Sequence, residues 1–129
     1  MTLLDTHVLL WMASDDKRLS KRAHEVIRKA REGSGIAVAT ITLWEIAWLA
    51  HHQRIVVVGS LESFVRETAA RVILRPVTVE VAVLAARLPE SFPRDPADRL
   101  IAATAMVEGM TLVTADARIR QSKLLKTVW

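Results

Sequence analysis

The sequence lacks several features that would point to common classes of site. It contains no cysteine, which excludes disulfide bonds and thiolate metal sites. The glycine-rich phosphate patterns GxGxxG and GxxxxGKS/T are both absent. Aromatic residues make up only 5% of the chain and none is tyrosine, which argues against a platform for stacking single-stranded bases. Apolar runs are broken by charges well short of the ~20 residues that a membrane span needs.

The composition that remains is that of a compact domain. Half of the residues (51%) are hydrophobic, and 129 residues are enough for one core, so we expect a single domain over residues 1–129. No basic-then-apolar leader opens the chain, and we expect a cytoplasmic protein without membrane contact. The net charge of +4 and the pI near 10.1 give weak support for a polyanionic partner such as nucleic acid.

Short β-prone runs alternate with helical patterns along the chain. We predict strands around Leu3–Leu4, Ile36–Ala39, Val72–Val77, Thr111–Val113 and Lys126–Trp129. Helices are predicted around Val8–Met12, Ser20–Glu32, Thr42–His52, Ser60–Arg71, Thr78–Leu88 and Pro96–Glu108, with a short turn or helix after Asp116. The run Ile55–Val58 fits either a strand or a hydrophobic connector. This alternation predicts a three-layer α/β/α fold, with a mainly parallel sheet of about four to five strands and helices on both faces.

Two helix starts carry specific signals. Asp95 followed by Pro96 is typical of an N-cap and the first helical position. Thr42 and Glu45 match a capping box at the start of the helix that follows the second strand. In the same helix, Trp44 and Trp48 lie one turn apart and off the expected core stripe. They are either covered by a neighbouring helix or line a groove for a partner helix.

Four acids are placed where the fold would bring them to one edge of the sheet. Asp5 follows the first strand and Asp116 follows the strand at Thr111–Val113, whereas Glu45 and Asp98 lie early in two largely apolar helices. In a parallel α/β sheet, the carboxyl ends of strands and the N-termini of the following helices share one edge. We therefore predict that the four carboxylates converge.

Converging carboxylates indicate a hard divalent cation. Without one, they would repel each other and some of their pKa values would rise. Oxygen ligands suit Mg²⁺ and Mn²⁺, which can activate water for the hydrolysis of a phosphodiester. Each acid also has a plainer explanation. Asp5 fits a helix cap, Glu45 a capping box, Asp98 a favourable partner for a helix dipole, and Asp116 the start of a turn.

The motifs themselves resemble a known family. LLDTHVLLW, TLWEIAWL, DPADRLIAATA and LVTAD, in this order, resemble the PIN-domain family, and within it the VapC-type toxins of bacterial toxin–antitoxin pairs. The resemblance covers the whole chain. It implies a Mg²⁺- or Mn²⁺-dependent endoribonuclease that acts on RNA, is blocked by a cognate VapB-like antitoxin and forms a homodimer.

The resemblance also assigns roles to residues. Carried over motif by motif, the family's metal-binding acids fall on Asp5, Glu45, Asp98 and Asp116. Supporting positions fall on Thr114, two residues before the last acid, and on Thr6, directly after the first. DPADR offers two acids, and we prefer Asp98 as the ligand, with Asp95 in a supporting role.

Several nearby residues have weaker predictions. Arg99 and Arg118 are candidates to contact RNA phosphates or to anchor an acidic residue of a partner, although solvated or paired surface arginines are at least as common. His7 is expected to be packed in the first helix, and contact with the metal or a phosphate is the minority interpretation. His7 also stands where a haloacid-dehalogenase-type phosphatase needs its second acid, which makes that enzyme class a poor fit. The alternative from another class is a non-catalytic RNA- or antitoxin-binding module of the same fold.

Overall fold

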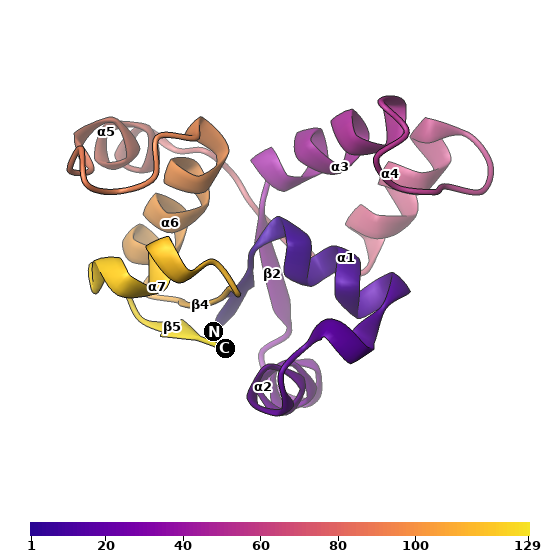
Figure 1. The fold of residues 1–129 in the computed structure, drawn as a ribbon, viewed down its shortest axis with the longest axis horizontal. Coiled ribbons are helices and arrows are strands. Elements are labelled where there is room, and N and C mark those ends of the chain that lie inside the picture. The colour runs from indigo at the N-terminus through magenta and orange to yellow at the C-terminus, as the bar shows by residue number, and fades with distance from the viewer.

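The centre of the computed structural model, which describes all 129 residues, is one sheet of five parallel strands (Figure 1). The strands are β1 (Thr2–Leu4), β2 (Ile36–Ala39), β3 (Ile73–Arg75), β4 (Thr111–Val113) and β5 (Thr127–Val128). Their order is β3-β2-β1-β4-β5, so the first strand of the chain is the central one. β1 pairs with β2 on one side and with β4 on the other.

Seven α-helices connect and cover the strands (Figure 1). They are α1 (Thr6–Ser14), α2 (Lys21–Glu32), α3 (Ile41–His51), α4 (Leu61–Ala70), α5 (Val79–Arg87), α6 (Pro96–Glu108) and α7 (Ala117–Ser122). A single 3-10 turn, η1 (Asp16–Arg18), joins α1 to α2. No helix is both long enough and apolar enough to cross a membrane.

The sheet separates two hydrophobic cores, because successive side chains of a strand point to opposite faces. Leu3 and Leu112 pack with the buried side chains of α6 and α7, while Leu4 and Val113 pack with those of α1 and α2. All four leucine and valine side chains are fully buried. The three-layer α/β/α arrangement and the parallel sheet predicted from the sequence are therefore confirmed.

Several helix ends follow the local signals in the sequence. The side chains of Ser20, Ser60 and Thr78 each accept a hydrogen bond from a backbone N–H three residues on. Asp95 caps α6 through a 2.8 Å bond from the backbone N–H of Ala97. Gly109 ends that helix in the left-handed conformation, with φ of 65°.

Two local predictions are corrected by the structure. The capping box is wrong, because α3 begins at Ile41, directly after Thr40, and Thr42 is already inside the helix. The Thr42 side chain is fully buried and contacts the start of α1 instead. The run Ile55–Val58 forms no strand and serves as a connector between α3 and α4.

Candidate active site

Asp5 sits at the carboxyl end of the central strand and is 3% exposed. Its backbone N–H donates to the carbonyl of Val113 on β4, which fixes the start of α1 against the sheet. One carboxylate oxygen, Oδ1, accepts a 2.8 Å bond from the N–H of Thr6. The other, Oδ2, accepts a 2.7 Å bond from the hydroxyl of Thr114. Asp5 is thus both a helix cap and a buried carboxylate with two donors.

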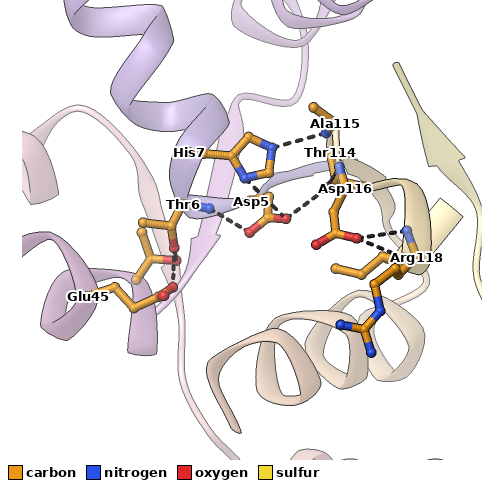
Figure 2. A network of polar contacts seen from close by, with 10 residues as sticks. Asp5, Thr6, His7, Glu45, Thr114, Ala115, Asp116 and Arg118 are labelled. Carbon is orange, nitrogen blue, oxygen red and sulfur yellow. Dashed lines mark hydrogen bonds and ion pairs between the residues drawn. The ribbon is translucent and has the colours of Figure 1, made fainter. Parts of the chain in front are cut away.

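Asp116 lies three residues beyond β4, in a loop built around Thr114 (Figure 2). The Thr114 hydroxyl donates to Asp5 and accepts a 3.0 Å bond from the N–H of Asp116, so it joins the two acids. The Asp116 carboxylate caps α7 by accepting from the N–H groups of Arg118 and Ile119, at 2.8 and 3.1 Å. β1 and β4 are neighbours in the sheet, which explains why acids 111 residues apart in sequence meet here.

Glu45 reaches the same edge from α3 (Figure 2). Its carboxylate accepts a hydrogen bond from the hydroxyl of Thr6. Because Thr6 gives its hydrogen to Glu45, the 3.0 Å contact between the hydroxyls of Thr6 and Thr42 has Thr42 as the donor. Burial raises the pKa of Glu45, the Thr6 hydrogen bond opposes that rise, and the charges of Asp5 and Asp95 add to it.

Asp98, in the first turn of α6, receives no hydrogen bond from the chain. Burial raises its pKa to about 7, and the negative charges of Asp5, Asp95, Asp116 and Glu45 contribute further in that order. Four carboxylates therefore lie within electrostatic range of Asp98. We call these five acids the acid cluster: Asp5, Glu45, Asp95, Asp98 and Asp116.

The two arginines predicted to contact RNA differ in their surroundings. The guanidinium of Arg99 donates to the carbonyls of Ala85, Leu88, Pro89, Phe92 and Pro93, at 2.9 to 3.4 Å. These bonds fold the loop between α5 and α6 around it, so its donors are not free for a phosphate and we do not propose an RNA contact for it. Arg118 is exposed, and its side chain makes no hydrogen bond within the chain.

Sequence reasoning missed two residues of this network. Thr42 was assigned to a capping box, yet its hydroxyl supports Thr6 and through it Glu45. His7 was expected to be a packed helix residue, but its Nε2 accepts a 3.0 Å bond from the backbone N–H of Ala115. Both contacts join parts of the chain that are far apart in sequence. No local pattern predicts either of them.

Comparisons with known proteins bear on the family and the fold of the chain. The family model described as PIN domain matches residues 2–123. The chain belongs to the PIN-domain family. Ribonuclease VapC22 of Mycobacterium tuberculosis is 43% identical over 129 residues, covering 98% of this chain and 97% of that protein.

Solved structures with the same fold include toxin–antitoxin complexes. VapBC2 of Rickettsia felis, bound to a promoter DNA fragment, has a TM-score of 0.74 at 16% identity, covering 98% of this PIN domain and 96% of that chain. FitAcB of Neisseria gonorrhoeae has a TM-score of 0.69 at 20% identity, covering 100% and 97%. At these identities the likeness establishes the fold of the PIN domain alone.

The donor set of the PIN domain's acid cluster fits a hard divalent cation. Its side chains offer carboxylate oxygens, which Mg²⁺ and Mn²⁺ prefer, and no sulfur or free imidazole pair competes. No three of these acids, as they stand, are close enough to hold one ion between them. Burial is the main cause of the raised pKa values of Asp98 and Glu45, and the neighbouring negative charges, which a cation would offset, raise them further.

A large cavity of the PIN domain lies elsewhere. It has a volume of about 840 Å³ and is lined mainly by residues of α1 and α4, including Trp11 and Phe64, with Arg18, Arg31 and Arg71 among its polar residues. None of the five acids lines it. The cavity therefore marks a different surface from the one that carries the acids.

Proposed function

We propose that this chain is a divalent-metal-dependent endoribonuclease, with Asp5, Glu45, Asp98 and Asp116 as the acids that bind the metal. The observation that carries the proposal is Asp98, a carboxylate without a hydrogen-bond donor among four other negative charges. Such an arrangement costs stability unless a bound ligand compensates for it. The 43% identity to a ribonuclease supports the substrate class.

Bound Mg²⁺ or Mn²⁺ would supply an activated water and neutralise charge on the attacked phosphate. The chain's own residues keep the ligands in place. Asp5 is oriented by Thr6 and Thr114, Asp116 by the first N–H groups of α7, and Glu45 by the Thr6 hydroxyl. Asp98 is free to turn towards a ligand because the chain places no donor on it. Asp95, engaged as the cap of α6, supports the position of Asp98.

The substrate and partners in this proposal rest on the relatives. We propose RNA as the substrate, a cognate VapB-like antitoxin as the inhibitor, and a homodimer as the assembly. The net charge of +4 favours a polyanion, and the exposed side chain of Arg118, just past Asp116, is available to a phosphate. The solved complexes of toxin with antitoxin have the same fold as this chain.

The test is RNA cleavage by purified, antitoxin-free protein. Cleavage should require Mg²⁺ or Mn²⁺ and stop when a chelator is added. Asp98→Asn should lower kcat/KM by at least about 100-fold, since removing one group that stabilises transition-state charge typically has an effect of that size. Glu62→Gln, which neutralises an exposed acid in the first turn of α4, is the matched control and should leave the rate unchanged.

Two results would contradict the proposal. One is cleavage that persists in excess chelator. The other is a parent protein that neither binds Mn²⁺ in a calorimetric titration nor cleaves RNA, which would favour the non-catalytic binding module.

A further inference from the structure

We propose that His7 is a positioning residue that fixes the loop between β4 and α7 relative to Asp5. This loop, Thr114–Asp116, carries the hydroxyl that binds Asp5 and one of the proposed metal-binding acids. The role in metal binding rests on the proposed function, whereas the contact between helix α1 and the loop does not. Figure 2 shows the imidazole of His7 between the Asp5 carboxylate and Ala115 of the loop.

The hydrogen bond to the loop determines which ring nitrogen carries the proton. A backbone N–H can only donate, so Nε2 of His7 must be the acceptor of the 3.0 Å bond from Ala115. The hydrogen of the neutral ring is then on Nδ1. That nitrogen faces Oδ2 of Asp5 at 3.6 Å, too long for a good hydrogen bond but close enough for attraction to the carboxylate. One side chain therefore connects the Asp5 carboxylate to the loop backbone.

At its two ends the loop is also held by the N–H of Thr114, which donates to the carbonyl of Val128 at 3.1 Å, and by the bonds from α7 to Asp116. Thr114 holds it through the hydroxyl that donates to Asp5, and the N–H of Asp116 donates back to that same hydroxyl. Both of these bonds depend on a single oxygen atom. His7 adds a separate contact, the hydrogen bond from Ala115, which lies between Thr114 and Asp116. Loss of it would let Ala115 turn and move the Asp116 carboxylate relative to Asp5.

The imidazole is itself held in orientation by aromatic packing. The ring of Trp11, one turn further along α1, lies 4.9 Å from it between centroids and tilts by 58°. Trp11 is in turn flanked by Trp129 at 5.7 Å and by the Arg18 guanidinium, 4.1 Å from its ring centroid. A side chain packed in this way loses little further freedom when it bonds to the loop.

The alternatives are simple packing and direct contact with RNA. The His7 side chain is 31% exposed, more than a core histidine would be. Both of its ring nitrogens already face partners within the chain, which leaves none for a phosphate. A positioning role accounts for both the exposure and the two contacts.

Three substitutions separate these roles. His7→Phe keeps a ring against Trp11 and removes both nitrogens. His7→Asn keeps a polar group near the Nδ1 position that does not reach Ala115. His7→Gln can place an amide oxygen near the position of Nε2 and restore the acceptor. His51→Ala, which removes an exposed histidine at the end of α3, is the matched control.

The first measurement is hydrogen exchange of the Ala115 amide by NMR, in metal-free protein without RNA. We expect faster exchange in His7→Phe and His7→Asn, and near-parental protection in His7→Gln and His51→Ala. The second is Mn²⁺ affinity by calorimetry, which should fall about 10- to 100-fold in the first two variants, as for other groups that orient ligands, and recover in His7→Gln. For cleavage, kcat should fall in step while KM for RNA changes little.

Parental exchange of Ala115 in His7→Phe would overturn the proposal, and so would Mn²⁺ affinity unchanged by both His7→Phe and His7→Asn. A higher KM with parental exchange would assign His7 to RNA contact instead. If the parent neither binds Mn²⁺ nor cleaves RNA, the proposed function fails. The exchange of Ala115 still decides whether His7 holds the loop.

Discussion

The acids that follow strands accept more hydrogen bonds from the chain than the acids that lie on helices. Asp5 and Asp116 each accept two hydrogen bonds, and each caps the helix that follows it. Glu45 accepts one, from Thr6, and Asp98 accepts none. The pKa values of Glu45 and Asp98 are both raised, chiefly by burial.

The number of hydrogen bonds that each carboxylate accepts indicates whether the acid is needed for the fold. Capping accounts for Asp5 and Asp116 whether or not the protein binds a metal, because a helix N-terminus needs acceptors. It does not account for Asp98, whose ionised form is penalised and receives no donor in return. Removing the charge of a strand-end acid should therefore destabilise the fold, and removing that of a helix acid should stabilise it.

The largest effect is expected for Asp5→Ala. The change removes the cap of α1 and leaves the fully buried hydroxyl of Thr114 without its acceptor. Together these should lower the free energy of unfolding by about 2–4 kcal/mol and abolish RNA cleavage. Thermal and urea unfolding measure the first effect, and a fluorescent RNA assay the second. An unchanged melting temperature would contradict the claim that Asp5 stabilises the fold.

Thr114→Val should have the next largest effect, because valine has a similar shape and no hydroxyl. It leaves Oδ2 of Asp5 without its 2.7 Å donor and the N–H of Asp116 without its acceptor. We expect a loss of about 1–3 kcal/mol in the free energy of unfolding, measured by urea titration. Thr114→Ser keeps the hydroxyl and is the control. Equal losses in both variants would indicate packing and not hydrogen bonding.

Asp98→Asn should act in the opposite direction. At pH 8, in the presence of a chelator, we expect it to raise the free energy of unfolding by about 1–2 kcal/mol, since solvent reaching this partly exposed carboxyl reduces the full effect of its pKa shift. Adding Mn²⁺ should stabilise the parent and not the variant. A variant less stable than the parent at pH 8 would show that Asp98 has a structural role after all.

The free energy of unfolding should depend on pH in a direction set by the raised pKa of Asp98. The pKa of Asp98 is raised from an ordinary 3.8 to about 7, so between these values the folded state binds a proton that the unfolded state has released. Its contribution to stability is therefore present below about pH 4 and is lost as pH rises through about 7. The stability difference between Asp98→Asn and the parent should be small at pH 4 and grow towards pH 8. Urea titrations at several pH values measure it. A difference independent of pH would contradict this origin.

The smallest effect is expected for Glu45→Gln. The amide oxygen can still accept from Thr6, while the repulsion from Asp5 and Asp95 is removed. We expect a gain in the free energy of unfolding at pH 8 of less than about 1 kcal/mol, smaller than for Asp98→Asn. Differential scanning calorimetry with and without Mn²⁺ resolves shifts of this size. A clear loss of stability would show that the Glu45 carboxylate stabilises the fold, as the strand-end acids are expected to do.

Most of the fold could be predicted because its signals are local. The alternation of β-prone runs with helical patterns indicates a parallel sheet, and caps such as Ser20, Asp95 and Gly109 act within three or four residues of themselves. The edge shared by the four acids follows from the topology of such a sheet. For this reason their convergence was predictable without coordinates.

What could not be predicted depends on contacts between distant segments. Thr42 lies 36 residues from Thr6, and Ala115 lies 108 residues from His7. Thr42 and His7 each also fit a common local role, Thr42 as part of a capping box and His7 as a packed helix residue, and the local pattern favours that role. For Arg99, similarly, charge alone suggests a phosphate contact. Its five carbonyl partners become evident only when the loop from α5 to α6 is folded around it.

The position of β4 beside β1 has a consequence for the synthesis of the chain. The ribosome synthesises Asp5, Glu45 and Asp98 before it reaches β4, the strand at Thr111–Val113 that pairs with β1 and precedes Asp116. A nascent chain stopped before that point has most of the acids but no Thr114 to orient the first of them. Under the proposed function, cleavage activity would thus arise only after β4 has been synthesised and has paired with β1.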